Sequence, residues 1–266
     1  MDFTAARDLG GVLDVKADHP DTQLLAGGTD LMVGVNLEHH RPSRVVSVRR
    51  VKDLATVTAD RVGAGVTWAR LETSEHRALA QLARTIGSPQ IRAAGTIGGN
   101  VATASPAGDG LPWIAAANAH IVVRSKRRGE RVVPWNEFFV GVKETTLKDD
   151  EIITHVTIPA DIPPVQEFAK VGVRNAMVIS TVSCVVMRDD DGFRVALGSV
   201  APTPIRATAA EGMLNAESNI TDATLEQFAA MVSEEVRPIS DHRSTEAYRR
   251  HAAGVVARRL VERCLR

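Results

Sequence analysis

The segment Ala93-Ala94-Gly95-Thr96-Ile97-Gly98-Gly99-Asn100 (AAGTIGGN) is the most informative stretch of the chain. It places three glycines, a threonine and an asparagine in the six positions 95–100. An earlier segment, LLAGGTDL at residues 24–31, has the same order: an apolar run, two glycines and a small hydrogen-bonding residue. Because glycine tolerates positive φ angles, successive amides in such a turn can point at one anionic group. The pair of turns therefore predicts a diphosphate held by main-chain amides.

Neither turn matches the common nucleotide-binding motifs. The Walker loop requires Gly-Lys-Ser/Thr, and no lysine or arginine lies inside either turn. The glycines at 95, 98 and 99 do not have the G-x-G-x-x-G spacing of a Rossmann fingerprint. The spacing alone leaves one alternative open, in which the glycines serve only tight packing.

Composition excludes several classes of function. The chain has 266 residues, a formal net charge of zero and 44% hydrophobic residues, so global attraction to nucleic acid or to an anionic membrane has no support. No apolar run approaches the ~20 residues of a membrane span, and the first residues lack a signal-peptide pattern, so we expect a cytoplasmic protein. Its two cysteines, Cys184 and Cys264, cannot by themselves hold an iron–sulfur cluster.

Periodicity and turn residues predict an α+β chain in two parts. The prolines in Asp161–Pro164 mark the boundary, because proline cannot continue a helix or a central strand. Before this boundary we expect helices at 4–18, 31–38, 73–85 and 110–118, strands at 23–26, 44–48, 121–125 and 151–159, and a hairpin at 55–65. After it we expect strands at 178–188 and 193–200 around an Asp191-Gly192 turn, followed by helices at 206–214, 222–235 and 244–264.

At this point the sequence resembles a known family. LLAGGTDL together with SPQIRAAGTIGGNVATASPAGDGLP (88–112) is similar to the flavin-binding medium subunit of the molybdenum hydroxylases, which include the xanthine and carbon monoxide dehydrogenases. EFAKVGVRNAMVISTVSCVVM (167–187) resembles the start of that subunit's C-terminal domain. The resemblance implies an FAD-binding domain of the vanillyl-alcohol-oxidase (PCMH) type at 1–162, with subdomains at about 1–52 and 53–162. An α+β C-terminal domain at 165–266 follows.

The resemblance also implies which residues surround FAD. The first segment contributes Ala26, Gly27, Gly28, Thr29, Asp30 and Leu31, and the second contributes Thr96, Gly98, Gly99, Asn100 and Thr103. Asp109 is expected at the ribityl or ribose hydroxyls, Ile153 near the flavin ring and Lys170 near its pyrimidine end. Two alternatives stay open: Asp109 could cap a helix beginning at Gly110, and Lys170 could be a solvated strand residue. Ile86 stands where some relatives carry an aromatic residue, so the stacking partner of the ring is not assigned.

The implied function is electron transfer. Such a subunit binds FAD, takes electrons from a small 2Fe-2S subunit and passes them to NAD⁺, a quinone or dioxygen. A large molybdopterin subunit carries the substrate chemistry, in a dimer of heterotrimers. We expect neither a catalytic residue nor a metal ligand in this chain. The alternatives are a self-contained flavin oxidase or reductase and a non-catalytic assembly module. The basic last helix (Arg249, Arg250, Arg258, Arg259, Arg263 and Arg266) is either a solvated face or a docking surface for an acidic partner.

Overall fold

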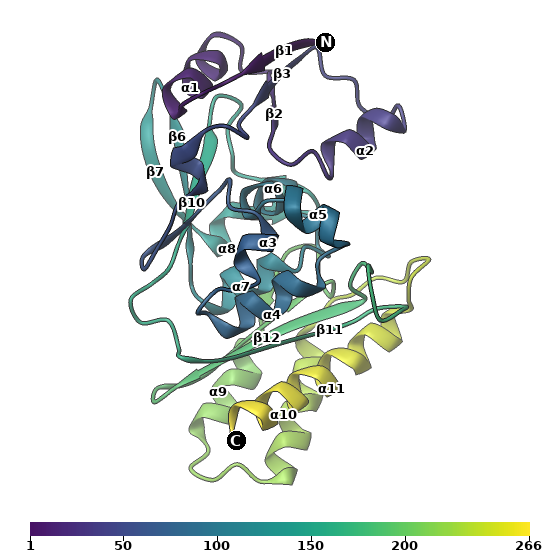
Figure 1. Ribbon diagram of the computed structural model, residues 1–266. Helices are drawn as coiled ribbons and strands as arrows, with labels where there is room; N and C mark the ends of the chain where they lie inside the picture. The colour runs from purple at the N-terminus through teal and green to yellow at the C-terminus, as the bar shows by residue number, and fades with distance from the viewer.

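The computed structural model describes residues 1–266, and it begins with a small parallel sheet (Figure 1). Its strands run in the order β1 (Asp2–Ala5), β3 (Arg44–Ser47) and β2 (Gln23–Leu25), with both pairs parallel. Helix α1 (Leu9–Asp18) connects β1 to β2 and packs on the sheet through Val12 and Leu13. Helix α2 (Leu31–Asn36) follows β2 and buries none of its side chains. In Figure 1 it stands apart from the rest of the molecule, at the upper right.

The second part is built on a five-stranded antiparallel sheet. Its order is β4 (Val57–Thr58), β5 (Arg61–Gly63), β10 (Ile152–Thr157), β6 (His120–Ser125) and β7 (Gly129–Pro134). The remaining elements of this part are η1 (Lys52–Ala55), α3 (Trp68–Leu71), α4 (Arg77–Thr85), α5 (Pro89–Ala94), α6 (Ile97–Thr103), α7 (Gly110–Ala116), α8 (Trp135–Phe138), β8 (Phe139–Gly141) and β9 (Glu144–Thr145). Helix α7 is buried along its whole length.

The third part is a four-stranded antiparallel sheet with helices. The strands are β11 (Val165–Val171), β12 (Val182–Asp189), β13 (Gly192–Gly198) and β14 (Ile205–Arg206), and the helices are α9 (Thr208–Ala216), α10 (Asp222–Glu235) and α11 (Glu246–Cys264). Both faces of the sheet are covered. Val185 and Met187 join the core around α4 and α7, whereas Cys184 and Val186 join the core around α10 and α11. This alternation follows from the two-residue period of a strand and places α7 directly on the sheet.

Most predicted elements are confirmed, including the hairpin at 55–65 and the β12–β13 hairpin around Asp191-Gly192. The first helix is wrong at its beginning, because residues 2–5 form β1 and pair with β3. The helix starts only at Leu9, where the side chain of Asp8 accepts a hydrogen bond from the Gly11 amide at 2.8 Å. The strand predicted to start at 178 begins at Val182. No helix is long and apolar enough to cross a membrane.

Candidate functional site

The two glycine turns lie against each other. A Cβ atom added to Gly27 would sit 1.9 Å from the carbonyl oxygen of Ala94, so only glycine permits this contact. A Cβ on Gly95 would lie 3.3 Å from Oγ1 of Thr29. The hydroxyl of Thr103 donates to Asp30 Oδ2 at 3.4 Å. The structure therefore brings the predicted residues of the two segments to one place.

The first turn presents free amides. Gly28 has a φ of 72°, in the left-handed region that glycine adopts without strain. The amides of residues 27–30 donate no hydrogen bond within the chain, although the turn is largely half-buried. Asp30 occupies the N-cap position of α2, but its side chain makes no capping bond. Half-buried amides without partners fit an anionic ligand such as a diphosphate.

The second turn is built differently, because most of its amides already have acceptors inside the chain. The amide of Gly99 donates to Oγ1 of Thr96 at 3.0 Å, because Thr96 caps the N-terminus of α6. The amides of Ile97 and Gly98 donate to the carbonyls of Val66 and Ala64 at 3.0 and 2.9 Å. None of the glycines in this turn has a positive φ.

Close packing explains the glycine at position 98. A Cβ there would lie 2.5 Å from both the Cβ and the carbonyl oxygen of Ala64, so α6 rests directly on the backbone that follows β5. At Gly99 the only near atom is Oγ1 of Thr96, at 3.2 Å. The second turn thus packs closely beside the first turn. Thr96, Gly98, Gly99 and Asn100 stay predicted neighbours of FAD, and of their amides only that of Thr96 donates no hydrogen bond within the chain.

Asn100 carries one of the buried side-chain oxygens that have no partner in the chain. Its Oδ1 is buried without a hydrogen-bond partner. It faces the start of α7, since a Cβ on Gly110 would lie only 2.6 Å from it. An unpartnered buried oxygen costs free energy unless a ligand or water satisfies it. The structure places this oxygen at the contact between α6 and α7.

Asp109 and Lys170 form a buried ion pair that joins the second and third parts of the molecule. Lys170 Nζ lies 2.7 Å from Asp109 Oδ2, and the two side chains are 9% and 7% exposed. The lysine also donates to the carbonyls of Thr85 and Val178 at 3.0 and 3.2 Å. Ser180 Oγ donates to Asp109 Oδ1 at 2.5 Å. Burial raises the pKa of the Asp109 carboxyl, and the contacts with Lys170 and Ser180 oppose that rise.

These contacts decide the two alternatives left open for Asp109 and Lys170, a helix cap and a solvated strand residue. Lys170 is not a solvated strand residue, since all three ammonium donors have partners inside the chain. Asp109 occupies the N-cap position of α7, but its side chain makes no capping bond. Sequence reasoning missed Ser180, which lies inside the family-like segment 167–187 but carries no spacing signal of its own.

Ile153 and Ile86 belong to the same apolar core. Ile153 is 6% exposed in β10, where it pairs with Val123 of β6 just before an irregularity in the register. Ile86 ends α4 and packs half-buried against that core. Their positions relative to a flavin ring stay predictions.

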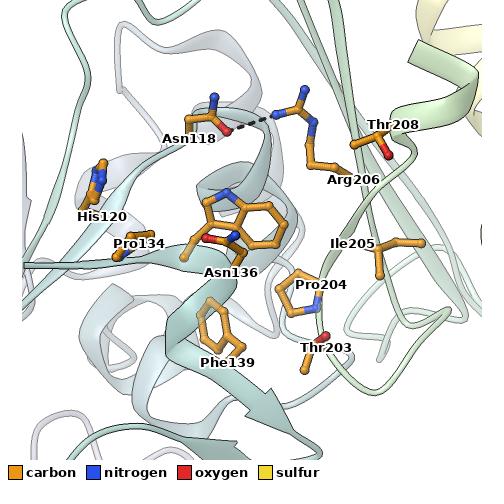
Figure 2. A pocket seen from close by; sticks show the side chains of 11 residues that line it. Asn118, His120, Pro134, Asn136, Phe139, Thr203, Pro204, Ile205, Arg206 and Thr208 are labelled. Atoms are coloured by element: carbon orange, nitrogen blue, oxygen red, sulfur yellow. Dashed lines mark hydrogen bonds between the residues drawn. The ribbon is translucent and has the colours of Figure 1, made fainter. Parts of the chain in front are cut away.

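A separate open cleft of about 700 Å³ lies between the second and third parts (Figure 2). Its lining includes Asn118, His120, Trp135, Phe139 and Arg206, and none of the predicted FAD residues. The guanidinium of Arg206 donates to Asn118 Oδ1 at 3.1 Å and is paired with the carboxylate of Glu211. Since the charged group of the cleft already has its partners, we assign no ligand to it.

The fold and the turn define a class: a dinucleotide-binding α+β protein outside the Rossmann and Walker types. The comparisons with known proteins make this specific. Residues 1–161 match the model of the FAD binding domain in molybdopterin dehydrogenase, and residues 167–264 match that of the CO dehydrogenase flavoprotein C-terminal domain. The chain belongs to this molybdopterin dehydrogenase flavoprotein family, and it is an FAD-binding oxidoreductase subunit.

Individual relatives agree over nearly the full length. A xanthine dehydrogenase FAD-binding subunit of Escherichia coli O157:H7 is 31% identical, covering 97% of this chain and 94% of the relative. The nicotinate dehydrogenase FAD-subunit of Eubacterium barkeri is 30% identical over 94% of this chain and 90% of its own. Among solved structures, carbon monoxide dehydrogenase from Hydrogenophaga pseudoflava gives a TM-score of 0.88 at 27% identity, covering 98% of this chain and 96% of that one. The resemblance inferred from the sequence is confirmed.

Proposed function

We propose that this chain is the electron-transfer subunit of a molybdenum hydroxylase complex. It would take electrons from a small 2Fe-2S subunit and deliver them to an external acceptor, which is NAD⁺, a quinone or dioxygen. When bound, FAD supplies the redox chemistry that takes up single electrons and releases pairs. The names of the relatives support the assembly, because they are FAD subunits and medium chains of dehydrogenases. We extend this to a dimer of heterotrimers with a large molybdopterin subunit.

The observation that carries the proposal is the run of free amides at residues 27–30 beside the second glycine turn. We assign Ala26–Leu31 to the diphosphate and adenosine side of FAD. We assign Thr96, Gly98, Gly99, Asn100 and Thr103 to the facing side of the same site. Amide donors neutralise part of the phosphate charge without a cationic side chain, which agrees with the absence of lysine and arginine from both turns.

We place Asp109, Lys170 and Ile153 toward the flavin end of FAD. Because Lys170 is paired with Asp109, the two act on the ring as a nearly neutral unit. Such a unit stabilises the anionic form of reduced flavin less than a lone lysine would. We further propose that the FAD-binding unit spans 1–162, with subdomains at about 1–52 and 53–162, and that the C-terminal unit spans 165–266. The junction then lies at the Asp109–Lys170 pair.

The full chain, expressed alone and with its small and large partner subunits, tests this function. Gel filtration followed by visible absorption measures bound flavin, and addition of the organic substrate to the complex measures whether that flavin is reduced. We expect flavin in both preparations and reduction by substrate only in the complex. Absence of flavin from the complex contradicts the proposal. Substrate turnover by the isolated chain would instead support a self-contained flavin enzyme.

A further inference from the structure

Arg249 departs from the other charged residues of the basic helix α11. Three other arginines of that helix are at least partly exposed and form ion pairs: Arg250 with Glu246, Arg258 with Glu262, and Arg263 with Glu167. Arg249 is only 4% exposed. This single arginine therefore has a role inside the molecule that neither a solvated face nor a docking surface explains.

The guanidinium of Arg249 holds the ends of two strands. Its Nη1 donates to the carbonyl of Thr181, just before β12, at 2.8 Å, and to the carbonyl of Ser199, just after β13, at 3.0 Å. Its Nη2 donates to Asp241 Oδ1 at 2.7 Å. Ser199 has a φ of 65°, which is unfavourable for a residue with a side chain, so its contacts must hold it there.

Both strand ends touch the loop that leads into α7. Ser180, next to Thr181, donates its hydroxyl to Asp109. The amide of Ser199 donates to the carbonyl of Pro106 at 2.7 Å. The Arg249 side chain thus holds the backbone at Thr181 and Ser199. Ser180, next to Thr181, and the amide of Ser199 in turn bind Asp109 and Pro106 in the loop before α7.

We infer that Arg249 is a positioning residue for the FAD site: through Thr181 and Ser199 it sets the place of Asp109 and, with it, of Lys170. This inference rests on the proposed function, because it takes the Asp109–Lys170 pair as the flavin end of the site. Arg249 itself touches neither residue of that pair. Its influence reaches them through the backbone of two strands, so we expect it to change FAD affinity and flavin potential as well as stability.

The partner of Arg249 keeps the contact charged over the ordinary pH range. Burial acts to raise the pKa of Asp241, but hydrogen bonds from the amides of Arg243 and Ser244 and from Arg249 outweigh it, and the pKa falls to about 2. The Asp241 carboxylate therefore stays ionised near neutral pH and keeps its contact with Arg249.

The test compares Arg249→Met with Arg258→Met in the full-length chain. Both changes remove one arginine from α11, but Arg258 pairs only with acidic residues of α10 and α11. FAD dissociation constants and flavin reduction potentials are measured well below the melting temperature, with folding checked by circular dichroism. We expect Arg249→Met to weaken FAD binding by about tenfold or more and to shift the potential, while Arg258→Met binds like the wild type. Arg249→Lys, which can still reach one carbonyl, should recover part of the affinity.

A double variant tests the route of action. If Arg249 acts through Ser180 and Asp109, adding Ser180→Ala to Arg249→Met weakens FAD binding no further than the stronger single change. Losses that multiply independently overturn the inference, as does an Arg249→Met protein with lower stability but wild-type affinity and potential. If Arg249→Met does not fold, the same measurements of FAD affinity and flavin potential are made on Arg249→Lys and Asp241→Asn. A wild-type chain that binds no FAD defeats the proposed function instead, so the two failures are distinguishable.

Discussion

The two glycine turns look alike in the sequence, but the structure uses them for different purposes. In the first turn Gly28 adopts a positive φ, and the amides of residues 27–30 have no partner in the chain. In the second turn the amides of residues 97–100 are all bonded internally and no glycine has a positive φ. The first turn presents donors, whereas the second lets a helix approach its neighbours closely.

This difference shows that a glycine in such a turn can serve either of two physical purposes. A positive φ redirects the backbone, and a missing Cβ permits close approach. Gly28 serves the first reason; Gly27 and Gly98 serve the second. Substitutions that add a single methyl group test both reasons: we expect changes at Gly27 and Gly28, in the first turn, to lower ligand affinity, and a change at Gly98, inside the core, to lower the stability of the fold.

The largest effect is expected for Gly27→Ala. Its new Cβ would meet the Ala94 carbonyl at 1.9 Å, so the two turns must move apart. Overpacking of this kind costs about 3 kcal/mol, which corresponds to roughly 100-fold weaker FAD binding. Titration of the apoprotein with FAD measures it. Gly34→Ala in α2 is the matched control, since its Cβ meets only His40 at an ordinary 3.5 Å. Equal affinities for the two variants would contradict the contact between the turns.

Gly98→Ala should act on stability more than on affinity. The added methyl would lie 2.5 Å from the Ala64 backbone inside the core, and we expect a loss of about 2 to 3 kcal/mol in the free energy of unfolding. Gly99→Ala is the control in the adjacent position, where only Oγ1 of Thr96 is near. Chemical denaturation of both variants measures their free energies of unfolding. A Gly99→Ala protein as unstable as Gly98→Ala would show that the packing account of this turn is wrong.

Gly28→Ala should weaken FAD binding through backbone strain. Alanine at a φ of 72° costs about 1 to 2 kcal/mol, and relief of that strain redirects the amides of the turn. Gly129→Ala has nearly the same φ, 75°, and open space around its Cβ, in the β6–β7 hairpin. We expect both variants to lose similar stability and only Gly28→Ala to lose FAD affinity. The idea fails if Gly129→Ala weakens FAD binding as much.

Thr96→Ala should have the smallest effect. It removes the hydroxyl that caps α6 and leaves the Gly99 amide without its acceptor. Loss of an N-cap costs about 1 kcal/mol, seen as a lower thermal midpoint. FAD affinity should change little, because that amide faces the cap. A large loss of FAD affinity with no loss of stability would indicate instead that the second turn binds the phosphates of FAD.

The sequence predicted the helices and strands well, but it did not predict which main-chain amides of the two turns have acceptors inside the chain. Hairpin turns such as Asp191-Gly192 and the last three helices depend on neighbouring residues, which a sequence displays directly. The state of the amides at 97–100 depends on the carbonyls of Ala64 and Val66, some thirty positions away. Spacing within the turn contains no information about those acceptors. For the same reason the predicted helix at 4–18 begins too early and overlaps the end of β1, whose partner β3 lies about forty residues later.

The candidate site shows the same division. The resemblance predicted that Asp109 and Lys170 both lie near FAD, but it did not predict their ion pair, which forms between α7 and the C-terminal sheet. Arg249 looked like one more charge on a basic helix. Its burial follows from the position of α11 beneath the ends of β12 and β13, which no periodicity in the helix reveals.

Amide hydrogen exchange, read residue by residue with and without FAD, tests the central claim most directly. Without FAD, we predict fast exchange at residues 27–30 and slow exchange at 97–100, because only the latter amides are bonded inside the chain. Saturating FAD should slow exchange strongly at 27–30 and leave 97–100 almost unchanged. Protection gained at 97–100 instead, or no gain at 27–30 while FAD is bound, would contradict the claim that the amides of the first turn, and not those of residues 97–100, hold FAD.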